Sequence, residues 1–428
     1  MSKGKCIVYR LSIIRELSLL RDPELNQVFD AVAINGNIAA YHDSLISEYI
    51  MNDSPAYFVD PMTYAFQFPQ RFKRADGAVK LSFKELAKKY GSPFSDCVEG
   101  RGKALNLDSF NEGGSIDTEK CRVLLKNIIE FEKNSKGDGQ AHRQSSLDEI
   151  TMLAGIALPT VSWKMPIFIV PPYFCANDFD GWYDLSLTFA TECANLEKEM
   201  PVLPVISISS SMIKKEEGRD RIVKDYGKFP GVLFWINDFD ETKVGTPDLF
   251  SLISLVVELR KTEMKVISLY GGYFSWLLRK VGLSAVVSGI CYNDYRNAQA
   301  PASTGGGKLR YYVPEVRKKL PLSEAGTFYS GVPEFDCMCK FCKEARGGMT
   351  PDIWFINLNQ MESGADDIVR KHFMTCRKEE TKEIDSLDLN DILSLLGKQI
   401  DTLGKSIDVT HLSSWKIAFE QFIDSTKE

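Results

Sequence analysis

The sequence predicts an α/β fold, namely an eight-stranded (β/α)8 barrel of the TIM type followed by a smaller subdomain and a helical tail. Two observations lead to this prediction. Apolar strands and amphipathic helices alternate from residue 165 to residue 288, and the chain upstream has room for about three more such units. Strands without polar alternation, separated by helices, are typical of parallel strands buried on both faces.

The alternation can be followed unit by unit in the second half of the chain. We expect strands at 166–170, 202–207, 231–236, 265–269 and 284–288, and helices at 181–199, 214–226, 247–261 and 273–281. Five units here, with about three upstream, favour a barrel over the alternative of an open doubly wound sheet. No G-x-G-x-x-G or G-x-x-x-x-G-K-[ST] motif follows a strand, so nucleotide cofactors are unsupported.

The expected organisation has three parts. Residues 1–300 form the barrel, with a helical and loop insertion around 81–155, residues 301–378 form a subdomain, and residues 379–428 form helices that pack on the barrel or on a partner. Within the insertion, the apolar spacing of 121–131 predicts a core helix. The stretch 134–146 is rich in Gly, Ser and charge, which predicts a mobile surface loop, and His142 in it has no nearby ligand partner.

Composition is that of an ordinary globular protein. Hydrophobic residues make up 44% and charged residues 26% of the 428 residues. The net charge of −6 argues against a globally basic nucleic-acid binder but allows a local basic patch. Arg10 and Arg15 interrupt the first apolar run, and no apolar run reaches the roughly 18 residues of a membrane span. Ten cysteines, mostly scattered singly, suit a reducing compartment, so we expect a cytoplasmic protein.

Several expected strands end in polar or small residues, as the active face of a barrel requires. Asp60 follows the apolar run 56–59, and Pro61 disfavours helix at that point, although a loop-capping aspartate is the simpler alternative. The other strand-end groups are Asn177, Asp178 and Asp180; Ser207 and the serines at 209–211; Asp238, Asp240 and Glu241; and Tyr270, Gly271 and Gly272.

Two of these groups suggest specific chemistry. Asp238, Asp240 and Glu241 place three carboxylates within four residues. If two of them share a pocket with Asp60, mutual repulsion would separate them into an acid and a nucleophile or base; a solvated acidic loop is the alternative. The paired glycines at 271 and 272 allow the backbone to approach a flat ligand closely, or simply make a tight turn.

A cysteine cluster follows the last expected strand. Cys337, Cys339 and Cys342 lie within six residues, and His372 follows thirty residues later. Three thiolates and an imidazole are ligands that a tetrahedral zinc ion prefers, and a closed four-ligand site has a structural role. Cys376, one helical turn after His372, is an alternative fourth ligand. The competing interpretation is a group of reduced surface cysteines.

Basic residues gather around this cluster. Two tyrosines are interleaved with basic residues just before it, which is the pattern that a nucleic-acid backbone and its bases would meet; a solvated basic β-hairpin is the alternative. The candidate nucleic-acid-binding residues are Lys308, Arg310, Arg317, Lys318, Lys319, Lys340 and Lys343.

The Cys-x-Cys-x-x-Cys pattern with a distant His372, placed after the final barrel strand, resembles the zinc site of the tRNA-guanine transglycosylase family. The sequence at 58–64 (Phe-Val-Asp-Pro-Met-Thr-Tyr) is similar to that family's strand-end aspartate and stacking aromatic. The resemblance implies proton transfer by Asp60, base stacking by Tyr64, and a base pocket that includes Glu241, the 270–272 turn and Asp178.

The chain departs from that family at the last barrel strand. The family's nucleophilic aspartate is expected near Ser288, where no carboxylate stands, and Asp294 comes six residues too late. Asp238 or Asp240 is then the candidate nucleophile. This divergence resembles the paralogues that place 7-deazaguanine bases into DNA, so the substrate expected is DNA rather than tRNA.

The resemblance therefore implies an enzyme that replaces guanine in a nucleic acid with a 7-deazaguanine such as preQ0 through a covalent carboxylate intermediate. It also implies a structural Zn²⁺ ion, and either partner proteins or a homodimer. Two alternatives stay open: a catalytically silent nucleic-acid-binding or protein-binding subunit of a transglycosylase complex, and a base-releasing N-glycosidase.

Overall fold

The computed structural model describes residues 7–134, 164–290, 297–300, 309–332, 337, 339–361 and 363–427. Its centre is a parallel sheet of seven strands in the order β3-β2-β1-β9-β8-β7-β6. These strands are β1 (Ile7–Leu11), β2 (Ala31–Asn35), β3 (Ala56–Asp60), β6 (Val205–Ile208), β7 (Gly231–Ile236), β8 (Lys265–Ser268) and β9 (Ala285–Gly289).

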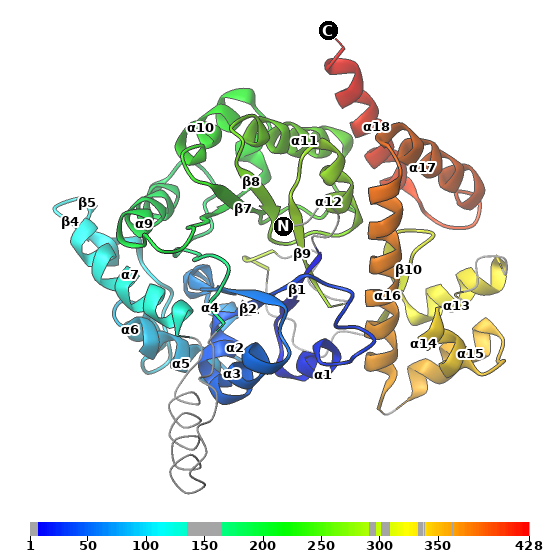
Figure 1. Ribbon diagram of the computed structural model, residues 1–428, viewed down its shortest axis with the longest axis horizontal. Helices are drawn as coiled ribbons and strands as arrows, with labels where there is room; N and C mark the ends of the chain where they lie inside the picture. Colours follow the sequence, from blue (N-terminus) through cyan, green and yellow to red (C-terminus); the bar gives the residue numbers. More distant parts are fainter. Residues whose placement is uncertain are drawn as a thin grey trace, which may run out of the picture.

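Helices surround the sheet (Figure 1). Those that follow the first three strands are α1 (Leu17–Leu20), α2 (Gly36–Tyr41), α3 (Asp43–Asn52), α4 (Pro69–Phe72), α5 (Leu81–Tyr90), α6 (Phe94–Val98) and α7 (Thr118–Lys133). Those of the second half are α9 (Gly181–Leu196), α10 (Glu216–Tyr226), α11 (Thr246–Lys261) and α12 (Tyr273–Leu277). A small hairpin, β4 (Asn111–Glu112) and β5 (Ser115–Ile116), precedes α7.

The strand order shows how the chain winds. From β1 to β3 and again from β6 to β9, each step moves in the same direction along the sheet, and β9 returns to lie beside β1. Right-handed crossovers that all move one way place all their helices on one face of the sheet. The chain is therefore singly wound, unlike an open doubly wound sheet, which carries helices on both faces.

A segment without regular strand structure, residues 164–176, lies between the two edge strands. The Ile167 amide donates to the Tyr57 carbonyl of β3, at 2.9 Å. On the other side, Ile169 forms a parallel bridge with Val202 and Ala176 forms one with Ile208 of β6. The segment thus contacts both edges of the seven-stranded sheet.

The second-half strands and helices confirm the expected alternation closely. The strand predicted at 231–236 coincides with β7, and the helix predicted at 247–261 begins one residue earlier as α11. The strand expected at 166–170 is the exception, because residues 171, 172, 201 and 204 are prolines, which donate no hydrogen bonds to a ladder. Only isolated bridges form there.

The C-terminal part lies to one side of the sheet (Figure 1). It consists of the antiparallel hairpin β10 (Arg310–Val313) and β11 (Lys318–Pro321), and of helices α13 (Leu322–Gly331), α14 (Lys340–Arg346), α15 (Pro351–Gln360), α16 (Ala365–Ser386), α17 (Leu389–Leu403) and α18 (Thr410–Ser425). The long helix α16 runs between the sheet and α13–α15 in Figure 1. None of the described helices is long and apolar enough to cross a membrane.

Local sequence explains several helix starts. Asp117, Asp180 and Asp388 precede α7, α9 and α17, and each carboxylate accepts a hydrogen bond from a backbone amide of the first turn. In α11 a proline occupies the first turn, where its missing amide costs nothing. The helix expected at 121–131 lies within α7. The loop expected at 134–146, with His142, and the final part of the expected insertion fall almost entirely outside the described residues.

Candidate active site and metal centre

The carboxyl ends of β1, β2 and β3 bring together a buried polar cluster. Arg10, Asn35 and Asp60 are the last or next-to-last residues of these strands, and all three side chains are buried. One Arg10 Nη1 donates to Asp60 Oδ2 at 2.5 Å and to Asn35 Oδ1 at 2.7 Å. We call Arg10, Asn35, Asp60, Tyr173 and Tyr270 the strand-end cluster.

Asp60 is fully engaged by its neighbours. Besides the ion pair with Arg10, its Oδ1 accepts hydrogen bonds from the Met62 amide at 3.0 Å and from the Tyr173 hydroxyl at 2.9 Å. Burial and the nearby Asp60 carboxylate raise the pKa of Tyr173, so its hydroxyl stays a proton donor. Asp60 is therefore a carboxylate whose oxygens already have three donors.

Aromatic rings surround this carboxylate. Tyr64 stacks on Tyr173, with ring centroids 5.4 Å apart, and meets Trp235 of β7 edge to face at 4.7 Å. Trp235 in turn packs on Tyr270 at 5.0 Å, and the Arg10 guanidinium lies 4.3 Å from the centre of the Tyr270 ring. Flat apolar surfaces beside a buried carboxylate and guanidinium suit a planar polar ligand.

The electrostatics of the cluster favour the charged form of Arg10. Burial alone would lower its pKa, but Tyr270 and Asp60 raise it above its usual value. The Arg10 Nη2 also donates to the carbonyl of Leu269, which follows β8, at 3.3 Å. One guanidinium thus joins the ends of β1, β2, β3 and β8.

The other candidate carboxylates have different partners. Asp238 is exposed, and its oxygens accept from the Ser210 amide at 2.7 Å and the Ser210 hydroxyl at 3.1 Å. Asp240 pairs with Lys243 at 2.9 Å and accepts from Thr242. Burial would raise the pKa of Asp240, but the bonds from Lys243 and Thr242 lower it. Both carboxylates are held by residues of their own or a neighbouring loop.

Glu241 is buried and supports the glycine turn. Its carboxylate accepts from the backbone amides of Gly272, Phe274 and Ser275, at 3.0–3.3 Å, and so caps the first turn of α12. A Cβ at Gly271 would clash with the side chain of Ser275. The glycine at 271 is therefore required by packing of the turn against α12.

Two further sequence candidates can be placed. Ser288 is fully buried on β9, and its hydroxyl donates to the Gly271 carbonyl at 2.9 Å. Asp178 is exposed, and one of its oxygens accepts from the amide of Phe179. Asp294 and Lys308 fall outside the described residues.

The cysteine cluster comes together as the sequence predicts. The ligand atoms of Cys337, Cys339, Cys342 and His372 lie within 4.8 Å of one another, and these four residues could hold a metal ion. Sulfur atoms bound tetrahedrally to one zinc ion lie about 3.8 Å apart, so this spacing fits such an ion. Cys339 precedes α14, and its sulfur lies 3.4 Å from the Cys342 amide.

Hydrogen bonds orient His372 toward the thiols. Its Nε2 lies 2.7 Å from the Tyr312 carbonyl oxygen, which can only accept, so Nε2 carries the proton. The other ring nitrogen, Nδ1, which could bind a metal ion, faces the sulfur atoms of Cys337 and Cys339, at 3.4 and 3.5 Å. A carbonyl bound to the far imidazole nitrogen is the usual support of a metal-binding histidine.

Two more groups touch this metal cluster. The Tyr311 hydroxyl lies 3.0 Å from Cys342 Sγ and 3.2 Å from His372 Nδ1, and the Tyr311 ring stacks on the imidazole at 4.1 Å. Cys376, one turn after His372 on α16, places its sulfur 3.5 Å from the same Nδ1. Both fourth-ligand candidates therefore lie at the cluster, and His372 completes the set of four mutually close donors.

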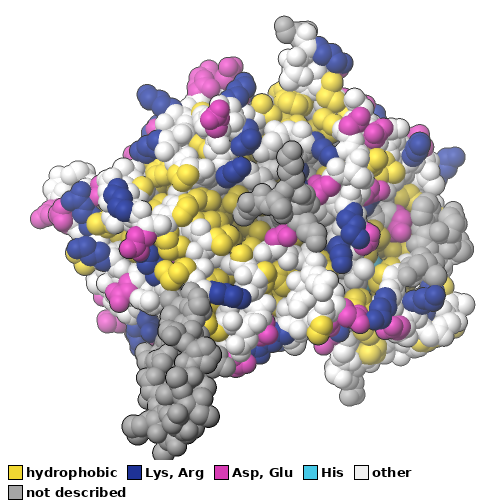
Figure 2. All heavy atoms as spheres, viewed as in Figure 1, with side chains coloured by type: hydrophobic (Ala, Val, Ile, Leu, Met, Phe, Trp, Pro, Cys, Tyr) yellow, Lys and Arg dark blue, Asp and Glu magenta, His cyan; other side chains and the backbone are white. Residues whose placement is uncertain are grey.

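The basic candidates divide by exposure. Arg317 is buried and pairs with Glu380 and Glu383 of α16, each at 2.8 Å. Lys340 is exposed but pairs with Glu24 at 2.6 Å. Arg310 and Lys343 are exposed, and Lys318 and Lys319 are half-buried. Figure 2 shows positive and negative side chains interspersed over one face, with apolar side chains gathered over its middle.

Sequence reasoning missed Arg10, Asn35, Tyr173 and Tyr311. Arg10 served only to argue against a secretory signal, yet it is a charged residue at the fourth position of a five-residue apolar strand. A charge in a strand that is buried on both faces needs a partner. That rule was the available signal for Arg10. Tyr311 was noted only as one of the two tyrosines in the basic segment, with nucleic-acid binding as the interpretation, and nothing local marked Asn35 or Tyr173.

The chain matches none of the protein-family models and none of the curated proteins with which it was compared.

Proposed function

We propose that this protein exchanges a guanine in a nucleic acid, with DNA favoured over tRNA, for a 7-deazaguanine such as preQ0. One observation carries the proposal. Asp60 lies at the end of a parallel strand, buried among Tyr64, Tyr173, Trp235 and Tyr270, as a site for a flat heterocyclic base would require.

The chemistry would proceed in two displacements. A carboxylate oxygen attacks C1′ while the bond from C1′ to N9 breaks, and the departing guanine takes up a proton. The incoming deazaguanine then gives up its N9 proton and attacks C1′, which releases the carboxylate. The target base must leave the stack for either step.

Residues can be assigned to these steps. We propose that Asp60 transfers the proton, which requires a bound base to displace at least one of its three present donors. Asp238 or Asp240 would be the nucleophile, after release from Ser210 or Lys243 respectively. Tyr64 would stack on the base, and the 270–272 turn, braced by Glu241, would line the pocket together with Asp178.

The proposal also includes the finer architecture. The seven strands and the bridging segment 164–176 would together form the eight-stranded (β/α)8 barrel, with a structural zinc ion held by Cys337, Cys339, Cys342 and His372. Zinc bound there would brace the subdomain, while Arg310, Lys318, Lys319 and Lys343 would contact the nucleic acid. We propose the cytoplasm as the place of action.

Base exchange can be tested with radiolabelled guanine and deazaguanine. The purified protein should incorporate label into duplex DNA, single-stranded DNA or tRNA, and Asp60→Asn should abolish incorporation while zinc content is unchanged. Asp220→Asn, at an exposed aspartate of α10 to which the proposal gives no role, is a matched control and should retain most activity. Absence of incorporation into all three nucleic acids, with and without partner proteins, would refute the enzymatic proposal.

A catalytically silent binding subunit is the second candidate, and Ser288 favours it. A buried serine stands where the resemblance to the transglycosylases would place a nucleophilic aspartate, and no side chain of the described part of β9 carries a carboxylate. Nucleic-acid binding without a covalent adduct on denaturing gels would support this role, whereas a trapped adduct would exclude it. Release of free guanine without incorporation would instead identify a base-releasing N-glycosidase.

A further inference from the structure

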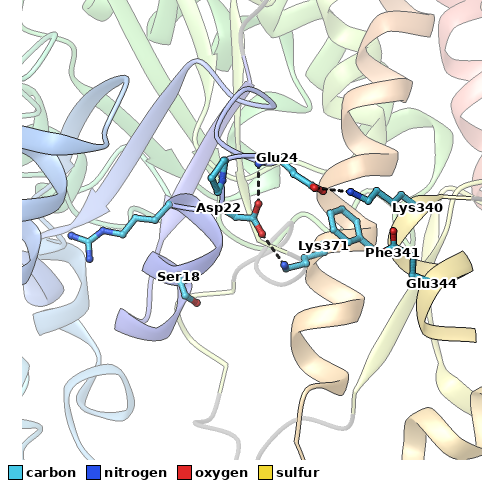
Figure 3. A pocket seen from close by; sticks show the side chains of 9 residues that line it. Ser18, Asp22, Glu24, Lys340, Phe341, Glu344 and Lys371 are labelled. Atoms are coloured by element: carbon cyan, nitrogen blue, oxygen red, sulfur yellow. Dashed lines mark hydrogen bonds and ion pairs between the residues drawn. The ribbon is translucent and has the colours of Figure 1, made fainter.

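The cysteine-rich subdomain meets the start of the chain along a charged seam. Arg370 pairs with Glu16, Lys371 with Asp22 and Lys340 with Glu24, at 2.8, 2.7 and 2.6 Å. The residues of the last two pairs, drawn in Figure 3, line an open cavity of about 680 Å³. Of these three pairs only Arg370–Glu16 is buried, so removal of one partner there would leave an unpaired buried charge, whereas the two more exposed pairs contribute little.

The seam residues are immediate neighbours of the candidate metal ligands. Arg370 and Lys371 directly precede His372 on α16, and Lys340 lies between Cys339 and Cys342. Their backbones are fixed by the same helical turns that hold the ligand atoms together. The seam and the metal cluster therefore share the helices α14 and α16.

On the opposite side, the seam reaches the strand-end cluster. Glu16 Oε2 accepts hydrogen bonds from the backbone amides of Ser12 and Ile13, at 2.8 and 3.1 Å. Ser12 is only two residues after Arg10 in the chain. Arg370 Nη1 also donates to the carbonyl of Ile290, directly after β9, at 3.1 Å. One guanidinium thus fastens the chain as it leaves β1 and as it leaves β9.

From this chain of contacts we infer that Arg370 is a positioning residue, which couples the order of the metal cluster to the placement of Arg10 and Asp60 at the strand ends. The inference relies on metal binding at the cysteine cluster but not on base exchange. The subdomain would then help to position side chains at the strand ends of the seven-stranded sheet, in addition to any contact with nucleic acid.

Hydrogen–deuterium exchange measured by mass spectrometry tests this coupling without any substrate. In the full-length protein, zinc chloride added after chelator treatment should slow exchange strongly in peptides covering 339–346, and by at least about tenfold at the more protected amides of 11–17. In Arg370→Gln, zinc should still protect 339–346, but its protection of 11–17 should be lost. Arg370→Lys should restore part of it.

Lys340→Ala is the matched control, because it removes a cation from the exposed edge of the same seam and should leave the zinc dependence at 11–17 intact. The inference is wrong if zinc does not protect 11–17 in the wild type, or if it protects this segment equally in Arg370→Gln. If Arg370→Gln does not fold, Glu16→Gln, which leaves the neighbourhood of the metal ligands unchanged, serves for the same comparison. Failure of base exchange would leave these results unaffected.

Discussion

The strand-end cluster and the metal cluster are both buried polar centres, but the chain builds them in opposite ways. The metal cluster uses two short segments, 337–342 and 372–376, and its spacing is visible in the sequence. The strand-end cluster takes one residue from each of several segments between residues 10 and 270. Its members become neighbours only when parallel strands align their ends.

The two clusters also differ in how their buried charges are neutralised. Arg10 and Asp60 neutralise each other. Asp60 also accepts from the Met62 amide and the Tyr173 hydroxyl, and Arg10 also donates to Asn35 and to the Leu269 carbonyl, although its Nε is buried without a partner among the described residues. Thiolates packed together repel one another, so the metal cluster needs a cation to be stable in the charged form. We therefore expect the first to be intrinsic to the fold and the second to depend on a bound ion.

Removing metal should give the largest effect. Structural zinc sites contribute about 10–16 kcal/mol of apparent binding free energy, which is lost to folding when the ion is chelated. Chelation, or Cys342→Ser, should therefore unfold the subdomain, as followed by circular dichroism and a zinc assay. Cys121→Ala, at a buried cysteine outside the cluster, should keep one zinc per chain. An unchanged melting profile after chelation would show that the subdomain does not depend on a bound ion.

Breaking the ion pair between Arg10 and Asp60 should have the second-largest effect on stability. Arg10→Met leaves Asp60 buried without its counter-charge, which costs about 3–5 kcal/mol in the free energy of unfolding. Asp60→Asn should cost a similar amount, and the double variant should cost clearly less than the sum, because no unpaired charge remains. Urea unfolding at pH 7 measures all three. Additive losses would show that the two side chains are not coupled.

The Tyr311 hydroxyl, which lies beside the thiols, should increase the affinity of the metal cluster for zinc. Tyr311→Phe keeps the ring that stacks on His372 but removes the group next to Cys342, so zinc affinity should fall by about tenfold to a hundredfold. Competition with a chromophoric chelator measures this affinity. Tyr329→Phe is the control, since its hydroxyl bonds to Glu315. Equal losses in both variants would mean that the effect is not specific to the thiol contact.

Glu132, near the strand-end cluster, should make the free energy of unfolding depend on pH, which is a smaller effect. Glu132 of α7 accepts from the Val170 amide, and burial raises its pKa well above the usual range. A carboxyl group whose pKa is higher in the folded than in the unfolded protein contributes stability that is fully present below the unfolded-state pKa, near about 4.3. Above that pH the free energy of unfolding falls by up to about 1.4 kcal/mol per pH unit, until the pH reaches the folded-state pKa.

Glu132→Gln should flatten this decline in urea unfolding measured from pH 5 to pH 8, and exposed Glu112→Gln should leave it unchanged. The same slope in wild type and Glu132→Gln would remove Glu132 as its source.

The sequence was sufficient for features that rest on local patterns. The strand 231–236, the helix at 247–261 and the Cys-x-Cys-x-x-Cys cluster with His372 could be predicted because neighbours in the chain determine them. The contact partners of a residue could not be predicted in this way, because they come from distant parts of the chain. Asp60 was identified by its place before Pro61, but the guanidinium that engages it comes from a strand fifty residues earlier.

Pairing also changes what a residue can do. The basic segment before the cysteines suggested a surface for nucleic acid, yet Arg317 in it is buried against Glu380 and Glu383. Likewise Glu241 was a candidate for base recognition, and its carboxylate caps α12. Charge along a sequence does not reveal which charges are neutralised by a distant helix.

Helix α16 carries three contact sets along its length: Arg370 at the seam, His372 at the thiols, and, more than two turns further on, Glu380 against Arg317 of the β10–β11 hairpin. Inserting one residue into an α-helix turns everything beyond it by about 100°. A single insertion between 372 and 380 would thus swing Glu380 away from Arg317 while leaving the other two sets in place. Substitutions can be absorbed one at a time along such a helix, whereas changes in its length cannot, and evolution should treat this segment as fixed in length.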